Sequence, residues 1–250
     1  MIRFEDVTKS FGKREILRGV NLEIEKGKTT VIFGVSGGGK STIIKHMVGL
    51  LKPDSGVITV EGIRVDNADE NTLREIRKKV GFLFQHGALF DSMNIRDNVA
   101  FPMMEHQKLT SKELEYKIDE KLTMVGLESK IVKSLYPEEL SGGMRKRVGL
   151  ARTLALEPEV ILYDEPTSGL DPVTSDFITQ MICRLRDEMG MTSVLISHDI
   201  AESFKAGDNY AMLFDGIIVE AGDKEAFQNS PNEVVQQFIH ARSNGPIAFH

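Results

Sequence analysis

Residues 34–41 read Gly-Val-Ser-Gly-Gly-Gly-Lys-Ser, which is the pattern G-x-x-x-x-G-K-S of a phosphate-binding loop. The apolar residues 30–33 before it predict a buried strand, and residues 42–51 after it predict a helix. Glycines let the backbone turn so that successive N–H groups point at phosphate oxygens, with the positive end of the helix behind them. Lys40 can then reach the β- and γ-phosphates, and the Ser41 hydroxyl can bind Mg²⁺.

The loop and its flanking elements predict a nucleoside triphosphate site, with a chance glycine-rich turn as the alternative. The residues expected to contact the nucleotide here are Gly34, Ser36, Gly37, Gly38, Gly39, Lys40, Ser41 and Thr42.

Two carboxylates, Asp164 and Glu165, follow the apolar residues 160–163. A buried strand would place Asp164 at its C-terminal tip, beside the phosphate loop, where it can hold Mg²⁺ directly or through water. Glu165 would then be positioned to activate a water for in-line attack on the γ-phosphate. The alternative is an ordinary strand exit with acidic loop residues, and the phosphate loop upstream favours the catalytic interpretation.

A second candidate anion site lies at residues 140–144, Leu-Ser-Gly-Gly-Met, before a helical pattern over residues 144–155. Ser141 and the two glycines would form a helix N-terminus suited to an anion. The chain therefore has two phosphate-binding helix ends but one lysine-bearing loop, unless this second one is a capped helix without a ligand.

Strand and helix patterns surround these motifs. The first third of the chain predicts a small antiparallel sheet, with strands around residues 2–7, 20–24 and 57–60. Continuous apolar strands at 81–84, 160–163 and 193–196 alternate with helices and predict a parallel sheet covered on both faces. Strand signals vanish between Gln85 and Pro158, which indicates a helical insertion, and Asp215-Gly216 predicts a hairpin turn.

Composition excludes several classes. The 250 residues carry a net charge of −6, so nucleic acid is not an expected partner. The single cysteine, Cys183, rules out a disulfide within the chain and fits a reducing cytoplasm. The N-terminus lacks an apolar signal region, and no apolar run approaches the roughly 18 residues of a membrane span.

These motifs, in this order, resemble the ATP-binding subunit of an ATP-binding-cassette (ABC) transporter. The resemblance implies a single ABC ATPase domain over residues 1–250: a P-loop NTPase (RecA-like) α/β core with a parallel sheet, an N-terminal antiparallel β subdomain and an inserted α-helical subdomain at about 86–158. A C-terminal extension would cover about 231–250. Family members bury two ATP molecules in a head-to-tail dimer, so Ser141, Gly142 and Gly143 would contact the ATP of a second copy.

The resemblance also assigns roles. Phe11 would stack on adenine, Gln85 would sense Mg²⁺ and link the core to the helical insertion, residues 168–171 would cross the dimer interface, and His198 would contact the γ-phosphate. ATP and Mg²⁺ are thus the expected cofactors; the expected catalytic residues are Glu165, His198, Lys40 and Gln85, and the expected metal ligands are Ser41, Gln85 and Asp164. Met144 and Phe11 replace the family's usual glutamine and tyrosine, but no acid or base is lost, so we expect ATP hydrolysis.

Shorter matches at residues 85–90, 98–102 and 140–147, with the tail, resemble the Mla/Mce lipid-transport ATPases. That resemblance implies a subunit peripheral to the cytoplasmic face of the inner membrane, powering movement of phospholipid or other hydrophobic compounds. Its partners would be a permease, gripped by a groove near residues 86–104, and a periplasmic lipid-binding subunit. The apolar side chains expected in the groove are Leu89, Phe90, Met93, Phe101, Met103 and Met104.

The tail has an apolar helical face at Val234, Val235, Phe238 and Ile239, followed by the possible anchors Ile247 and Phe249. Packing on its own core and reaching a second ATPase subunit are both compatible with this pattern, and the resemblance favours the second. Two alternatives to lipid transport remain at this point. One is an amino-acid or small-solute importer with the same cassette, and the other is a soluble ABC protein acting on nucleic acid or ribosomes.

Overall fold

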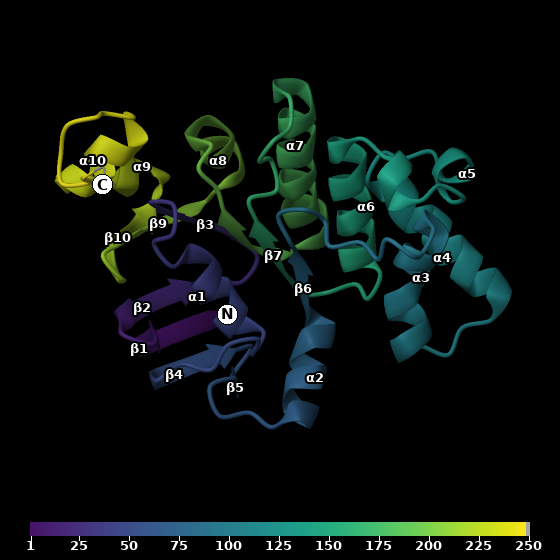
Figure 1. Ribbon diagram of the computed structural model, residues 1–250, viewed down its shortest axis with the longest axis horizontal. Coiled ribbons are helices and arrows are strands. Elements are labelled where there is room, and N and C mark those ends of the chain that lie inside the picture. The colour runs from purple at the N-terminus through teal and green to yellow at the C-terminus, as the bar shows by residue number, and fades with distance from the viewer. Residues whose placement is uncertain (249–250) are drawn as a thin grey trace.

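The computed structural model describes residues 1–248, so the expected anchor Phe249 and His250 lie outside the described residues. Two sheets and the helices around them form the chain (Figure 1). The larger sheet has the strand order β10-β9-β3-β8-β7-β6. Its strands are β3 (Thr29–Gly34), β6 (Val80–Leu83), β7 (Val160–Asp164), β8 (Thr192–Ile196), β9 (Asn209–Phe214) and β10 (Ile217–Asp223).

This core sheet is parallel from β9 to β6, as the apolar strands predict. At one edge β10 pairs antiparallel with β9, which confirms the hairpin predicted at Asp215 and Gly216. The cause is the two-residue turn at Asp215 and Gly216, where φ is 49° and 78°. Positive φ at both central residues is typical of the tight turns that join antiparallel neighbours.

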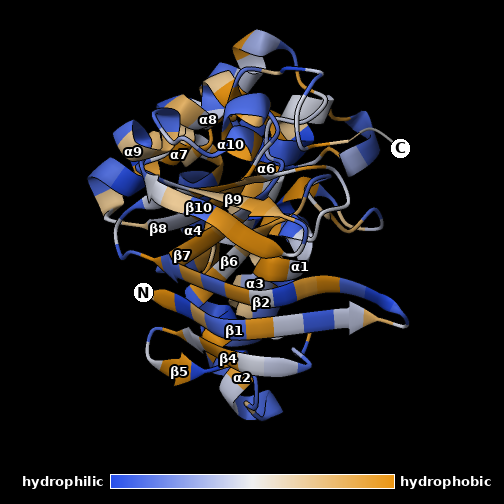
Figure 2. Ribbon diagram, turned by 90° about the vertical axis from the view of Figure 1, so that its left-hand side faces the viewer, coloured by the Kyte–Doolittle hydropathy of each residue, from blue (hydrophilic) through white to orange (hydrophobic). Residues whose placement is uncertain are grey.

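The smaller sheet is antiparallel, with the order β2-β1-β4-β5. Its strands are β1 (Ile2–Phe11), β2 (Arg14–Ile24), β4 (Ser55–Val60) and β5 (Ile63–Arg64). Figure 2 shows it below the core sheet, with apolar positions spread along the strands of both sheets. The structure therefore contains the N-terminal antiparallel sheet that the sequence predicts.

The core sheet separates two apolar clusters, because successive side chains of a strand point to opposite faces. On β3, Val31 and Phe33 belong to the cluster that includes residues of the helical insertion. Ile32 belongs to the cluster that includes residues of the antiparallel sheet. The strands of β7 and β8 alternate in the same way. Both faces are buried, which explains why these strands read as continuous apolar runs rather than alternating ones.

Helices cover the sheets and form the insertion. They are α1 (Lys40–Met47), α2 (Glu70–Lys79), α3 (Ile95–His106), α4 (Ser111–Met124), α5 (Ser129–Val132), the 3₁₀ turn η1 (Pro137–Glu139), α6 (Gly142–Leu154), α7 (Pro172–Met189), α8 (Ile200–Ala206), α9 (Lys224–Gln228) and α10 (Glu233–Ile239). Helices α3 to α6 gather at one end of the molecule, away from the antiparallel sheet (Figure 1). Thr110 begins α4 with a capping box to Glu113, which fixes the start of this helix.

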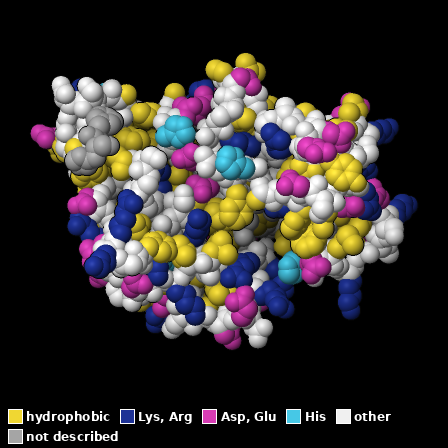
Figure 3. Space-filling model, viewed as in Figure 1, with side chains coloured by type: hydrophobic (Ala, Val, Ile, Leu, Met, Phe, Trp, Pro, Cys, Tyr) yellow, Lys and Arg dark blue, Asp and Glu magenta, His cyan; other side chains and the backbone are white. Residues whose placement is uncertain are grey.

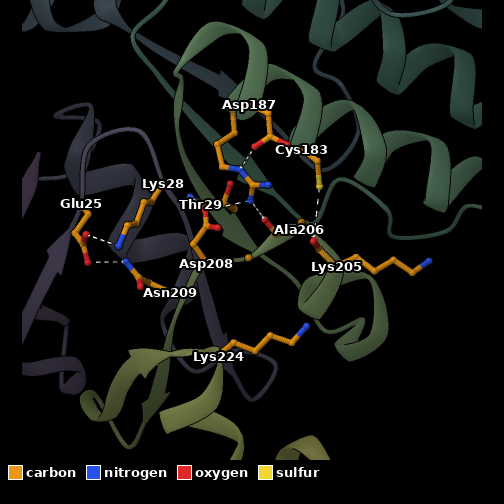
Figure 4. A network of polar contacts seen from close by, with 12 residues as sticks. Glu25, Lys28, Thr29, Cys183, Asp187, Lys205, Ala206, Asp208, Asn209 and Lys224 are labelled. Atoms are coloured by element: carbon orange, nitrogen blue, oxygen red, sulfur yellow. Dashed lines mark hydrogen bonds and ion pairs between the residues drawn. The ribbon is translucent and has the colours of Figure 1, made fainter.

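A polar network holds the base of β3 opposite the phosphate loop (Figure 4). The Asp208 carboxylate accepts a hydrogen bond from the Thr29 N–H at 2.8 Å and one from Arg186 Nη1 at 3.1 Å. Asn209 donates to the Glu25 carboxylate at 2.9 Å. These contacts tie β3, α7 and β9 together, so the strand that carries the phosphate loop is anchored at its far end.

The described part of the tail folds back on its own chain. The buried amide of Gln237 donates to the Ile247 carbonyl at 3.1 Å and accepts from the Ile247 N–H at 2.7 Å. Ile247 packs against the core cluster, as one of the two expectations for the tail requires. Helix α10 ends at Ile239, and the chain then runs on without a helix to Ile247.

Candidate functional site

The phosphate loop connects β3 to α1, at the edge where the C-terminal ends of the parallel strands β3, β7 and β8 meet. Gly39 precedes α1 with a φ of 102°, and α1 has no side-chain cap. A Cβ at Gly39 would lie 2.8 Å from Ile16 Cγ2, so a side chain at this position would collide with β2 as well as strain the backbone. The N–H groups of the first helical turn are thus left for an anionic ligand.

Helix α1 begins at Lys40, two residues earlier than the sequence predicts, so the lysine of the motif lies in the first turn. Lys40 Nζ donates to the carbonyl oxygens of Gly34 at 2.7 Å and Val35 at 2.9 Å. Burial lowers the pKa of Lys40, against the attraction of the Glu165 and Asp164 carboxylates. The ammonium group therefore sits inside the loop, at the place where phosphate oxygens would be held.

Ser41 and Asp164 come together across the sheet edge. The Ser41 hydroxyl donates to Asp164 Oδ1 at 3.1 Å. Burial raises the pKa of Asp164, an effect that the Ser41 hydrogen bond opposes. A hydroxyl and a carboxylate beside a phosphate loop are hard oxygen donors of the kind that Mg²⁺ uses together with phosphate oxygens, so these residues fit the ion.

Glu165 follows directly and points to two of the other predicted residues. Its Oε2 accepts a hydrogen bond from Gln85 Nε2 at 2.9 Å and lies 3.5 Å from His198 Nδ1. Glu165 has a φ of 51°, in the left-handed region, and its N–H donates to the Ile196 carbonyl at 2.9 Å. Residues from the ends of β6, β7 and β8 thus converge on one carboxylate.

The motif at residues 140–144 lies elsewhere. Ser141 is the N-cap of α6 and accepts from the Met144 N–H at 3.2 Å, so the helix begins at Gly142 rather than Met144. A Cβ at Gly143 would lie 2.6 Å from Thr174 Cγ2 on α7, which explains a glycine there. The structure thus places this motif against α7 and not on its own phosphate loop, and α6 and α1 lie apart in Figure 1.

Phe11 ends β1 with a half-exposed ring, and Lys9 Nζ lies 5.6 Å from the ring centroid.

Arg14 is a further residue beside the phosphate loop, and the sequence analysis did not identify it. Its Nη2 donates to the Gly37 carbonyl at 3.5 Å, and it lines a cavity of about 480 Å³ beside the loop. Only its position two residues after the Gly12 turn, near Phe11, could have indicated it.

Comparison with known proteins agrees with this geometry. The family model described as "ABC transporter" matches residues 17–168, which span β2 to the loop after β7. The chain belongs to the ABC transporter family. The ABC fold is also found in solved structures: the dimeric ATP-binding cassette MJ0796, described as a post-hydrolysis state bound to ADP and Pi, has a TM-score of 0.83 and 33% sequence identity, covering 89% of this chain and 98% of that one.

Curated ABC proteins match over almost the whole chain. The probable ribonucleotide transport ATP-binding protein mkl of Mycobacterium leprae is 43% identical over 98% of this chain and 70% of the relative. The intermembrane phospholipid transport system ATP-binding protein MlaF of Escherichia coli is 39% identical over 100% of this chain and 92% of the relative. The ABC-type ATPase class inferred from the motifs is thereby confirmed.

A groove of about 250 Å³ separates the ABC core from its helical insertion, lined by Val48, Leu50, Arg77, Lys78, Val80, Gly81, Phe82, Phe84, Pro102, Arg152, Thr153, Leu156 and Pro158. Of the apolar side chains expected near this groove, Met103 is fully buried in the insertion. Phe90, Phe101 and Met104 are exposed, and apolar side chains gather over this part of the molecule in Figure 3. Among residues 1–248, no helix has the length and apolar character to cross a membrane.

Proposed function

We propose that this chain is the ATP-binding and ATP-hydrolysing subunit of a membrane transporter that moves phospholipid or other hydrophobic compounds. The hydrolytic part of the proposal rests on five side chains that meet at one sheet edge: Lys40, Ser41, Asp164, Glu165 and His198. The proposed cargo rests on the match to MlaF, which is named for intermembrane phospholipid transport. MlaF matches this chain from end to end at nearly equal length.

In this proposal the loop N–H groups and Lys40 would bind the β- and γ-phosphates. Ser41, Asp164 and Gln85 would hold Mg²⁺, which would neutralise the charge that develops on the phosphates. Glu165 orients and polarises the attacking water as general base. Its hydrogen bond to Gln85 and its proximity to His198 fix the direction of the carboxylate. His198 and Lys40 then stabilise the γ-phosphate in the transition state, and Phe11 supplies an open aromatic face for adenine.

The proposal includes a head-to-tail dimer. Since Ser141, Gly142 and Gly143 lie away from the chain's own phosphate loop, the N-terminus of α6 can serve the nucleotide of a second copy. The dimeric arrangement of the MJ0796 cassette supports this. The groove between β6 and α3 would receive the permease, which would hold the chain peripherally at the cytoplasmic face of the inner membrane, and a periplasmic lipid-binding subunit would complete the complex.

Heterodimers that carry Lys40→Ala and Ser141→Arg test the composite site. With the two substitutions on different subunits, both fall in one site and the second site stays intact; with both on one subunit opposite a wild-type partner, each site is damaged once. We expect the first arrangement to hydrolyse ATP at about half the wild-type rate and the second to lose nearly all activity. The measurement is steady-state hydrolysis by heterodimers isolated with two different affinity tags.

The control is a heterodimer of wild type with Lys40→Ala, which measures what a single intact site can do. Equal rates in the two arrangements, with that control active, would contradict a head-to-tail dimer.

The cargo is tested on the assembled complex, because it is the membrane partner that contacts the transported compound. We expect phospholipid to copurify with the complex and its release or uptake by vesicles to require ATP. A ribonucleotide is the second candidate, since the mkl proteins carry that name at 43% identity. The lipid proposal would be replaced by this one if the complex retained no lipid, bound a ribonucleotide as cargo, and hydrolysed ATP faster in the presence of that ribonucleotide.

A further inference from the structure

Lys146 is a buried lysine on α6 to which none of the motifs above assigns a role. Its side chain is 5% exposed, and its hydrogen-bond partners are two backbone carbonyl oxygens rather than a carboxylate. Nζ donates to the Ser168 carbonyl at 2.5 Å and to the Glu165 carbonyl at 3.2 Å. Burial lowers the pKa of Lys146 to about 8. Enclosing a charge with neutral partners costs free energy, so the position is not explained by packing alone.

The two carbonyls belong to one turn. The Ser168 N–H donates to the Glu165 carbonyl at 3.2 Å, which closes the turn from Glu165 to Ser168. Lys146 thus binds both ends of the segment that begins with the proposed general base. Because Glu165 is held at a φ of 51°, the direction of its carboxylate depends on how this turn is fixed.

The same face of α6 also contacts the loop that follows Gln85. A Cβ at Gly149 would lie 2.9 Å from Gly87 Cα, so the helix and this loop approach to backbone contact. Lys146 and Gly149 are three residues apart and therefore lie on neighbouring positions of one helix face. Helix α6 consequently supports both residues that meet in the hydrogen bond between Gln85 and Glu165.

We propose that Lys146 is a positioning residue for ATP hydrolysis, which anchors the turn from Glu165 to Ser168 to helix α6 and so holds the Glu165 carboxylate toward the attacking water. The inference rests on the proposed function of Glu165. It also gives α6 a second task, because the helix whose N-terminus would serve the neighbour's nucleotide fixes the general base of its own subunit.

The test compares Lys146→Met, which keeps the length of the side chain and removes its donors, with Lys146→Arg, which keeps them. We expect Lys146→Met to lower kcat about tenfold or more, because displacing a catalytic group by a fraction of an ångström has effects of this order. The KM for ATP and the affinity for ADP should stay within about twofold, since the phosphate loop is untouched. Lys146→Arg should recover kcat to within about threefold of wild type.

Lys121 provides a matched control, because it is an equally buried lysine that lies on α4 and pairs with Glu157 at 3.2 Å. Lys121→Met is expected to leave kcat within about twofold of wild type even where thermal stability falls. If Lys146→Met does not fold, Lys146→Gln carries the test. Its kcat should lie below that of Lys146→Arg, with the KM for ATP within about twofold of wild type.

A Lys146→Met enzyme with kcat within twofold of wild type would overturn the inference. So would a joint loss of kcat and ATP affinity, or an arginine variant as slow as the methionine variant. Lys40→Ala and Glu165→Gln are measured in parallel. If Lys40→Ala and Glu165→Gln both hydrolyse ATP, the proposed function fails. If both are inactive while Lys146→Met hydrolyses ATP as wild type does, only the positioning role fails.

Discussion

Replacing Lys40 by alanine is expected to abolish ATP hydrolysis, with a fall in rate of at least about a hundredfold, while the chain stays folded. In the structure the Lys40 ammonium group contacts the carbonyl oxygens of Gly34 and Val35, both within the phosphate loop. The substitution therefore removes the positive charge from the phosphate site and leaves the two apolar clusters intact. Steady-state hydrolysis and thermal unfolding of the full chain measure the two effects.

Lys112→Ala is the matched control, since Lys112 is an exposed lysine at the start of α4, outside the candidate site. It should hydrolyse ATP as wild type does. A Lys40→Ala enzyme that matched this control would show that the loop does not hold the reacting phosphates.

Glu165→Gln is expected to slow hydrolysis by about a hundredfold or more and to leave nucleotide binding within about twofold. The amide keeps the shape of the side chain, and its oxygen can still accept the hydrogen bond that Gln85 Nε2 donates at 2.9 Å. What is lost is the negative charge that polarises the water. With ATP and Mg²⁺ present, gel filtration should therefore show more dimer than with wild type.

The exposed Glu138, at η1, supplies the comparison: Glu138→Gln should change neither hydrolysis nor the dimer fraction. Normal turnover by Glu165→Gln would assign the general base to another residue.

The sequence was sufficient for those parts of the fold that depend on local patterns. The strands β3, β7 and β8 were predicted because apolar side chains on both faces leave an unbroken apolar run. Helix starts were predicted less well where glycines are involved. Gly39 and Gly142 have low intrinsic helix propensity, yet α1 and α6 begin at or next to them, because the loop geometry rather than propensity sets the start.

Features that depend on how individual side chains pack against distant segments could not be predicted. Met103 has the same apolar character as the exposed Met104, and only the packing of α3 in the insertion decides which of them is buried. Lys146 reads as one of three consecutive basic residues, and its hydrogen bonds to Glu165 and Ser168 span 19 and 22 residues. The placement of candidate site residues on one sheet edge was predictable, because parallel strands bring their C-terminal ends together.

The folded-back tail has a practical consequence for anyone who engineers this protein. Pro246 and Ala248 line the cavity beside the phosphate loop, together with Ser36 and Gly37. A bulky group attached to the tail at Ala248 would thus lie next to the phosphate loop. An amino-terminal handle starts at Met1 instead, where it would disturb the ion pair between the terminal ammonium group and Glu61 at the edge of the antiparallel sheet.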